Sequence, residues 1–300
     1  MRRRRPRIGL HMLMWAAGLV YLMPLLWMAS VSLKPAREAA APGVALLPEF
    51  TEPPTLDGPP SMLATGYWAR LAAQASQNYG EVWHSPVADF PLYLHNSVLV
   101  SVLSVAGMVV SSAVVAYGFA RVRWPGRDGV FVVVLATLMI PQAVLMAPLY
   151  VLFKQLGWIG TFKPLWVPAW FGGAFSIFLL RQFFLTIPRE LDEAARIDGC
   201  SHWGTFTRII LPLSRPALAV VVLMQFIASW NDFLGPLLFL NHQDQYTLAL
   251  GLHMYQSQHG GTPWNLVMAA SFMVVAPVLV VYIFARRYFI EGVGAEGVKG

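Results

Sequence analysis

Six stretches of the sequence are long and apolar enough to cross a lipid bilayer as helices, each reaching the roughly 20 residues required. They are residues 8–33, 90–120, 129–153, 164–186, 216–240 and 264–285. The fourth reaches this length only when it is extended past Leu180, and the fifth contains one acid, Asp232. Only 12% of all residues are charged, about half the share in soluble domains. The sequence therefore predicts an all-α membrane protein with six transmembrane helices.

Lysine and arginine are distributed unevenly between the two sides that six spans define. Sixteen of the 21 lie in segments on the side of the N-terminus. The five on the other side are Lys34, Arg37, Arg70, Lys154 and Lys163. Because cytoplasmic loops carry an excess of these residues, both termini and the segment 187–215 are predicted to lie in the cytoplasm. This placement accounts for the net charge of +6 without nucleic acid as a partner.

The basic start followed by an apolar run could also be a secretory signal peptide. The 26 uncharged residues of 8–33 exceed the 7–15-residue apolar core of such signals, so we expect a retained anchor. The predicted organisation is a cytoplasmic basic N-terminus (1–7), a first transmembrane helix (8–33), an extracytoplasmic loop (34–89), a five-helix transmembrane core (90–285) with the cytoplasmic loop 187–215, and a cytoplasmic C-terminus (286–300).

The cytoplasmic loop contains a pattern that predicts a short helix of about three turns. Pro188 suits the first turn, where its missing N–H costs nothing, and Gly199 suits a left-handed stop. Its apolar positions follow the spacing of one helix face: Ile187, Leu191, Ala194 and Ala195. Charged residues occupy the remaining surface, with three acids near the positive end of the helix dipole: Glu190, Asp192 and Glu193. An interfacial helix without a partner would show the same pattern.

A longer motif in this loop is more restrictive. Glu193-Ala194-Ala195 is followed after three residues, Arg196, Ile197 and Asp198, by Gly199. After nine more residues comes Ile209-Ile210-Leu211-Pro212, and a second short helix is expected from Trp203 to Ile210. The pattern E-A-A-x-x-x-G-x9-I-x-L-P resembles the docking loop of permease subunits in ATP-driven, binding-protein-dependent importers.

The resemblance extends from Tyr93 onward and is strongest to the carbohydrate-uptake branch of the ABC importer permeases, in particular the smaller maltose-permease subunit. The matching segments are Asn96-Ser97, Ala116 to Arg121, Met139-Ile140-Pro141, Pro148-Leu149-Tyr150, Phe178 to Phe184, Trp230 to Phe233, Tyr246-Thr247-Leu248 and Gly297 to Gly300. The outer loop 34–89 departs from the branch by its length. Rich in proline, it is expected to be irregular with a short helix around 67–75, serving either as a contact for the binding protein or as a solvated linker.

The resemblance implies a type I ABC importer permease fold with a cytoplasmic coupling helix, in a bacterial or archaeal inner membrane. It implies a second permease subunit, two ATPase subunits and an extracytoplasmic solute-binding protein as partners. The residues expected to couple to the ATPase are Glu193, Ala194, Ala195, Asp198, Gly199, Ile209, Leu211 and Pro212. No cofactor is expected in this chain, since it has no G-x-x-x-x-G-K-[ST] phosphate loop; ATP and Mg would bind the partner ATPase.

Polar residues in the fifth stretch are candidates for the substrate pathway: Gln225, Trp230, Asn231 and Asp232. An ionisable residue inside a membrane is a functional hypothesis by default. Asp232 could accept hydrogen bonds from sugar hydroxyls beside the flat ring of Trp230. We favour the alternative that Asn231 and Asp232 bind neighbouring helices or the backbone loosened by Pro236. No metal site is expected, because the histidines lack ligand spacing and Cys200 is the only cysteine.

Other functions remain to be weighed against a sugar importer. The same architecture could import a polyol or a glycerol-phosphate-type solute, which the sequence does not distinguish. A proton-coupled carrier or a membrane enzyme would use Asp232, but a self-sufficient carrier would need more charge inside its spans than this one acid, and an internal repeat is not seen.

Overall fold

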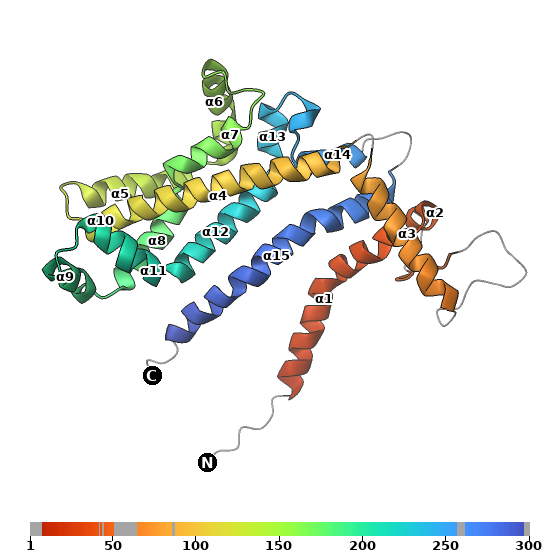
Figure 1. Cartoon of the computed structure of the whole chain (residues 1–300), viewed down its shortest axis with the longest axis horizontal. Helices are drawn as coiled ribbons and strands as arrows, with labels where there is room; N and C mark the ends of the chain where they lie inside the picture. Colours follow the sequence, from red (N-terminus) through yellow and green to blue (C-terminus); the bar gives the residue numbers. More distant parts are fainter. Residues whose placement is uncertain are drawn as a thin grey trace, which may run out of the picture. The chain divides into compact units, whose positions relative to one another are not determined.

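The computed structural model describes residues 8–41, 43, 45–50, 65–85, 88–256 and 262–296, and all regular elements in these ranges are helical. The predicted basic N-terminus, the prolines of 51–64 and the terminal match at 297–300 lie outside the described residues. The chain forms two compact units, one of residues 1–90 with 251–276, the other of 91–250 with 277–300. Figure 1 shows the helices of both.

The first unit contains the first apolar helix and most of the predicted outer loop. Its helices are α1 (Ile8–Ser32), α2 (Ala36–Ala40) and α3 (Thr65–Trp83), with the end of α14 (Leu248–Gln256) and the start of α15 (Trp264–Glu296). The short helix expected around 67–75 is part of the longer α3. Buried Asn78 of α3 donates to the carbonyls of Ser32 and Lys34 at 2.8 and 3.0 Å, which satisfies orphan groups at the end of α1. Asn265 of α15 donates to Asn78 Oδ1 at 3.1 Å.

The second unit contains the rest of the chain. Its elements are α4 (Phe90–Arg121), α5 (Arg127–Ala136), η1 (Thr137–Met139), α6 (Gln142–Gln155), α7 (Lys163–Trp166), η2 (Val167–Phe171), α8 (Ala174–Thr186), α9 (Glu190–Ile197), α10 (His202–Thr205), η3 (Phe206–Ile210), α11 (Leu211–Leu213), α12 (Arg215–Trp230), α13 (Leu234–Phe239) and η4 (Gln243–Gln245). Continuations of α14 and α15 also belong to it.

The described residues provide four helical segments that are apolar and long enough to span a membrane, and two bent pairs that raise the number to six. The stretch predicted as one span at 129–153 is one of these pairs, bent by 99° between η1 and α6. Pro141 lies at the bend, and Ile140 before it is extended (φ −84°, ψ 115°). A residue before proline is pushed out of the helical region, which gives the bend its physical cause.

The fourth stretch is also interrupted, at Gly172 and Gly173 between η2 and α8. Gly172 has φ +81°, a conformation that favours glycine. Two serines of α4 satisfy the freed backbone: Ser111 Oγ donates to Ala169 O at 3.3 Å, and Gly173 N donates to Ser112 Oγ at 3.3 Å. Non-helical backbone at membrane depth is tolerated only when protein or a cavity surrounds it. These contacts hold the interrupted segment against α4.

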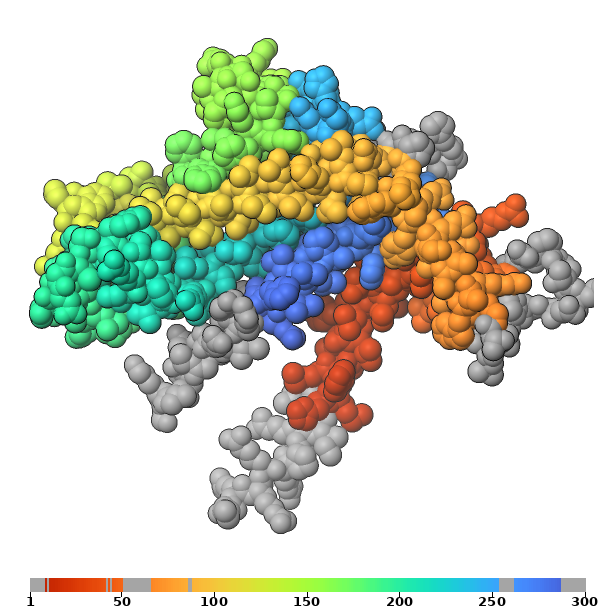
Figure 2. All heavy atoms as spheres, in the orientation of Figure 1, coloured from red at the N-terminus to blue at the C-terminus, as the bar shows by residue number. Residues whose placement is uncertain are grey.

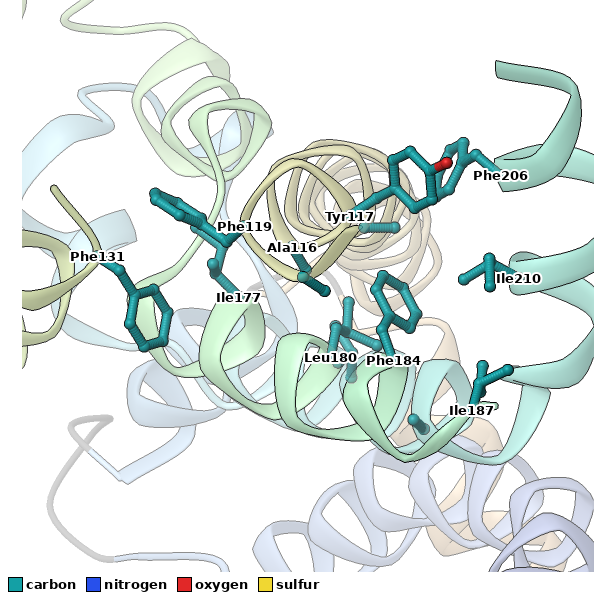
Figure 3. Packing of buried hydrophobic residues seen from close by; sticks show 14 residues of the cluster. Ala116, Tyr117, Phe119, Phe131, Ile177, Leu180, Phe184, Ile187, Phe206 and Ile210 are labelled. Atoms are coloured by element: carbon teal, nitrogen blue, oxygen red, sulfur yellow. The ribbon is translucent and has the colours of Figure 1, made fainter. Parts of the chain in front are cut away.

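The core of the second unit forms where α4 crosses α8. Figure 3 shows Ala116 and Tyr117 of α4 beside Leu180 and Phe184 of α8, with Phe206 against Tyr117. Leu180 and Phe184 are fully buried, and the rings of Tyr117 and Phe206 have centroids 4.9 Å apart. The small residues Ala113, Ala116 and Ala120 of α4 are almost fully buried in this core. This core supports the loop that follows α8.

Gly107 of α4 should be intolerant of a larger side chain, because Trp170 lies across it. The Trp170 indole donates to Leu103 O at 3.1 Å, and a Cβ on Gly107 would come within 3.0 Å of that ring. Gly107→Ala should therefore destabilise the protein by about 1–3 kcal/mol through overpacking. Thermal unfolding in detergent measures this, with Gly118→Ala on the same helix as control, since nothing lies within 4 Å of its Cβ position. Equal midpoints for the two variants would contradict the expected packing.

Candidate functional site

The helix predicted in the loop 187–215 exists, but it is shorter than expected. It is α9, eight residues from Glu190 to Ile197, or slightly more than two turns. Pro188 precedes the helix instead of opening it, and Ile187 before it is extended (ψ 131°). The steric effect of proline on its preceding residue accounts for the later start. The three acids lie in the first turn, as predicted.

Gly199 ends α9 in a left-handed conformation, with φ +77°. Two backbone hydrogen bonds close the end of the helix, from Cys200 N to Ala195 O at 2.8 Å and from Gly199 N to Arg196 O at 3.0 Å. This is the bonding pattern of the Schellman motif, in which glycine avoids the Cβ penalty. The predicted left-handed stop is confirmed.

The two alanines of the motif lie on different faces of α9. Ala195 is 4% exposed, whereas Ala194 is exposed together with Glu193, Asp198 and Gly199. The expectation of one apolar stripe through both alanines is therefore wrong. The stripe is divided because α9 turns the face of Asp192 and Ala195 toward the core and leaves Leu191 exposed; Ile197 is 87% exposed. Figure 2 shows α9 and the residues that follow it at the surface of this part of the molecule (green to teal).

Arg121, the last residue of α4, fixes the buried face of α9. Its Nη1 atom lies 2.7 Å from Asp192 Oδ2, with side chains 4% and 16% exposed. Its Nη2 atom donates to the carbonyls of Phe184 and, at 2.7 Å, Ile187. These carbonyls belong to the end of α8, where backbone acceptors lack helical partners. One guanidinium therefore joins α4, α8 and α9.

This contact was not predicted from the sequence, and Asp192, which was expected on the open surface of the helix, is largely buried. The two residues are 71 positions apart, so no local pattern pairs them. The available signal was Arg121 at the end of the matching segment that begins at Ala116. A basic residue at the end of a long apolar stretch is explained by membrane orientation alone. The sequence therefore provided no reason to expect that Arg121 also binds α8 and α9.

The second part of the loop is helical, as predicted, and includes a π-helix. Ser201 Oγ accepts from Gly204 N at 3.2 Å and caps α10, which continues into the π-helix Phe206–Ile210 and α11. Ile209 and Leu211 are partly buried, Pro212 is exposed, and Ile210 between them is fully buried. After α11 the chain bends by 78° into α12. Ile210, which was given no role, is the residue of this motif that reaches the core.

Residues 90–290, two thirds of the chain, match the family described as binding-protein-dependent transport system inner membrane component. The chain belongs to this family. It is a transmembrane permease subunit of a binding-protein-dependent transport system, and as a permease it is not itself an enzyme.

The permease is similar to known proteins over two thirds or more of its length. It is 34% identical to the trehalose/maltose transport system permease protein MalG of Thermococcus litoralis, covering 94% of this chain and 93% of that protein. It is 38% identical to the sn-glycerol-3-phosphate transport system permease protein UgpE of Agrobacterium fabrum, and this match covers 66% of this chain and 71% of that protein. A crystal structure of a bacterial ABC transporter involved in the import of alginate matches with a TM-score of 0.75 at 22% identity. The match covers 94% of this chain and 95% of the chain in that structure. That match confirms the predicted importer permease fold.

The structure brings the four candidate pathway residues of the permease to the end of α12. Trp230 is 1% exposed and stacks on Phe226 with centroids 5.2 Å apart, so its ring faces protein. Gln225 donates to Ser229 Oγ at 3.0 Å, and Asn231 donates to Ile227 O at 3.0 Å. Asp232 Oδ1 accepts from Gly235 N at 3.0 Å in the first turn of α13. Each of these polar groups has a local partner, which supports the structural alternative for Asn231 and Asp232.

Substitutions of Asp232 should separate its capping contact from its charge. Asp232→Asn keeps an oxygen acceptor for Gly235 N, so uptake and stability should stay near wild type. Asp232→Ala removes the cap, at a cost of about 1 kcal/mol, and should lower the thermal midpoint. Solute uptake and thermal unfolding of both variants provide the test. If Asn proves as damaging to uptake as Ala while stability is kept, the carboxylate acts on the solute or on a proton.

At its other end, α4 holds the segment between α13 and α14. Asn96 Nδ2 donates to the carbonyls of Asp244 and Tyr246 at 2.9 and 3.0 Å. Ser97 Oγ accepts from Leu248 N at 2.7 Å. Asn96-Ser97 is one of the matching segments of the sequence analysis, and its contacts show what these side chains do locally.

Proposed function

We propose that this permease forms half of the translocation pathway of an ATP-driven importer, in which α9 docks onto a separate ATPase subunit. The observation that carries the proposal is the division of α9 into two faces. Arg121 fixes the inner face to α4 and α8, while Glu193, Ala194 and Ile197 face outward. An exposed apolar residue among charged ones suits a helix that lies in a partner's groove. A helix attached on one side only can transmit movement of that partner.

The proposal also includes the other chains of such an importer. This chain has no phosphate-binding loop in its sequence, so ATP and Mg would bind two ATPase subunits. A second permease subunit would complete the pathway, and an extracytoplasmic binding protein would deliver the solute. Both termini and α9 would lie in the cytoplasm of a bacterial or archaeal cell, as the distribution of Lys and Arg indicates. ATP binding would then shift the bundle between inward-facing and outward-facing states.

The solute class that we favour is a sugar or oligosaccharide. The relative named for trehalose and maltose transport matches 94% of the chain, and a relative named for arabinooligosaccharide transport in Halalkalibacterium halodurans matches the same share. A glycerol-phosphate-type solute is the second candidate, since the relative named for that solute has the higher identity, over a shorter region.

Uptake by the reconstituted complex tests both parts of the proposal. Vesicles would contain this permease, its second subunit and the ATPase, with the binding protein outside and ATP inside. We expect uptake of trehalose, maltose or an arabinooligosaccharide that requires ATP and survives an uncoupler. Uptake that collapses with the proton gradient while ATP is maintained would contradict the energy source. Uptake of glycerol 3-phosphate but no sugar would assign the second solute class.

A further inference from the structure

A cavity of about 490 Å³ lies between the loop after α4 and the residue before α9. Its lining residues are Arg123, Trp124, Gly126, Arg127, Asp128, Gly129 and Arg189. Two features fix its wall: Trp124 Nε1 donates to Gly118 O at 3.3 Å, and Gly126 reverses the chain with φ +80°. Six of its seven lining residues are exposed, so it is open to the surface.

The cavity carries more positive charge than its acid compensates. Asp128 pairs with Arg127, with oxygen–nitrogen distances of 2.9 and 3.3 Å. Within the described ranges, neither Arg123 nor Arg189 has an ion-pair partner. Asp128 lies in the first turn of α5, where it offsets the positive end of the helix dipole, so the surplus charge of the cavity comes from its arginines. The arrangement favours an anion.

The sequence places the cavity at the boundary between lipid and water. It lies between the end of the uncharged stretch 90–120 and the start of 129–153. Tryptophan is enriched at this depth, and Trp124 is partly exposed there. Basic pockets beside transmembrane helices on the cytoplasmic side bind anionic lipid headgroups.

We propose that Arg123 and Arg189, which have no ion-pair partner among the described residues, bind the phosphate group of an anionic phospholipid headgroup in this cavity. Guanidinium groups match phosphate oxygens with paired, charge-assisted hydrogen bonds. The apolar lipid chains would lie along the span that begins with α5. A soluble phosphate ester offers the same chemistry, so the test must separate the two sources. The lining residues belong to the loop after α4 and to the residue before α9, so the proposed site does not depend on which solute is transported.

Native mass spectrometry of the purified complex with added phosphatidylglycerol measures the binding. The variant Arg123→Gln/Arg189→Gln removes two charges from the cavity, and Arg208→Gln/Arg215→Gln removes two exposed charges elsewhere in the predicted cytoplasmic loop. We expect the first pair to weaken phosphatidylglycerol binding by about 30-fold and the second pair to leave it unchanged. Equal binding by both pairs, or equal binding of phosphatidylcholine by the wild type, would overturn the proposal.

Two further arms complete the test. Inorganic phosphate at millimolar concentration should not displace the lipid, and displacement would assign the site to a soluble phosphate instead. Thermal unfolding of each variant confirms that it is folded. If the double variant loses stability, the single exposed substitution Arg189→Glu replaces it, and undiminished lipid binding by that variant would equally overturn the proposal.

Discussion

Replacing Arg121 with methionine should abolish ATP-driven uptake and destabilise the loop that carries α9. The substitution leaves Asp192 as a buried carboxylate without its cation and frees the carbonyls of Phe184 and Ile187. Loss of one partner of a buried ion pair costs about 3–5 kcal/mol, because the remaining charge stays out of water. Thermal unfolding and uptake by the assembled complex would both report the loss.

Asp192→Asn should be milder, since the amide oxygen can still accept from Arg121 and the two carbonyl contacts remain. The double variant should show non-additivity, as expected for residues in one network. Arg208→Gln is the matched control, because Arg208 is exposed and has no ion pair among the described residues. A thermal midpoint and an uptake rate of Arg121→Met equal to those of this control would show that the contact does not hold α9.

Changes on the outer face of α9 should uncouple ATP hydrolysis from transport without unfolding the protein. Glu193 is exposed, so Glu193→Ala should change stability by less than about 0.5 kcal/mol. If α9 is a central contact of the ATPase, loss of the Glu193 side chain should weaken binding of the ATPase by about 2 kcal/mol or more, which is roughly 30-fold in affinity. We expect uptake and binding-protein-stimulated ATPase activity to fall together, while basal hydrolysis remains.

Gly199 offers a second variant with a different cause. Its left-handed φ disfavours a β-branched side chain, although nothing lies within 4 Å of the Cβ position. Gly199→Val should therefore alter the end of α9 and lose coupling, whereas Gly199→Asn, which tolerates this conformation, should retain much of it. Glu81 is an exposed carboxylate on a different helix, α3. Glu81→Ala therefore controls for the loss of one negative charge. Wild-type uptake and stimulated ATPase activity in both Glu193→Ala and Gly199→Val would refute docking through α9.

Features set by composition and nearby residues were predictable from the sequence. The apolar stretches, the acidic first turn of α9 and the glycine stop depend on residues within a few positions of one another. The bend at Pro141 was predictable in kind, but its angle of 99° depends on packing around it.

Features set by distant contacts were not predictable. The burial of Asp192 depends on Arg121, and the division between Ala194 and Ala195 depends on which face of α9 meets the core. Trp230 illustrates the same limit. Its flat ring suggested a sugar contact, but Phe226 on the previous turn covers it. Docking surfaces for other chains are harder still to predict from the sequence. Ile197 is exposed in this chain, and the residue alone does not identify the partner surface that would bind it.

The two ends of α4 have a joint consequence. Arg121 attaches α9 at one end, and Asn96 with Ser97 attaches the segment 241–248 at the other. With 32 residues, the helix is about 48 Å long. One continuous helix therefore carries both attachments, so a shift of α4 along its axis would displace α9 and the segment 241–248 together.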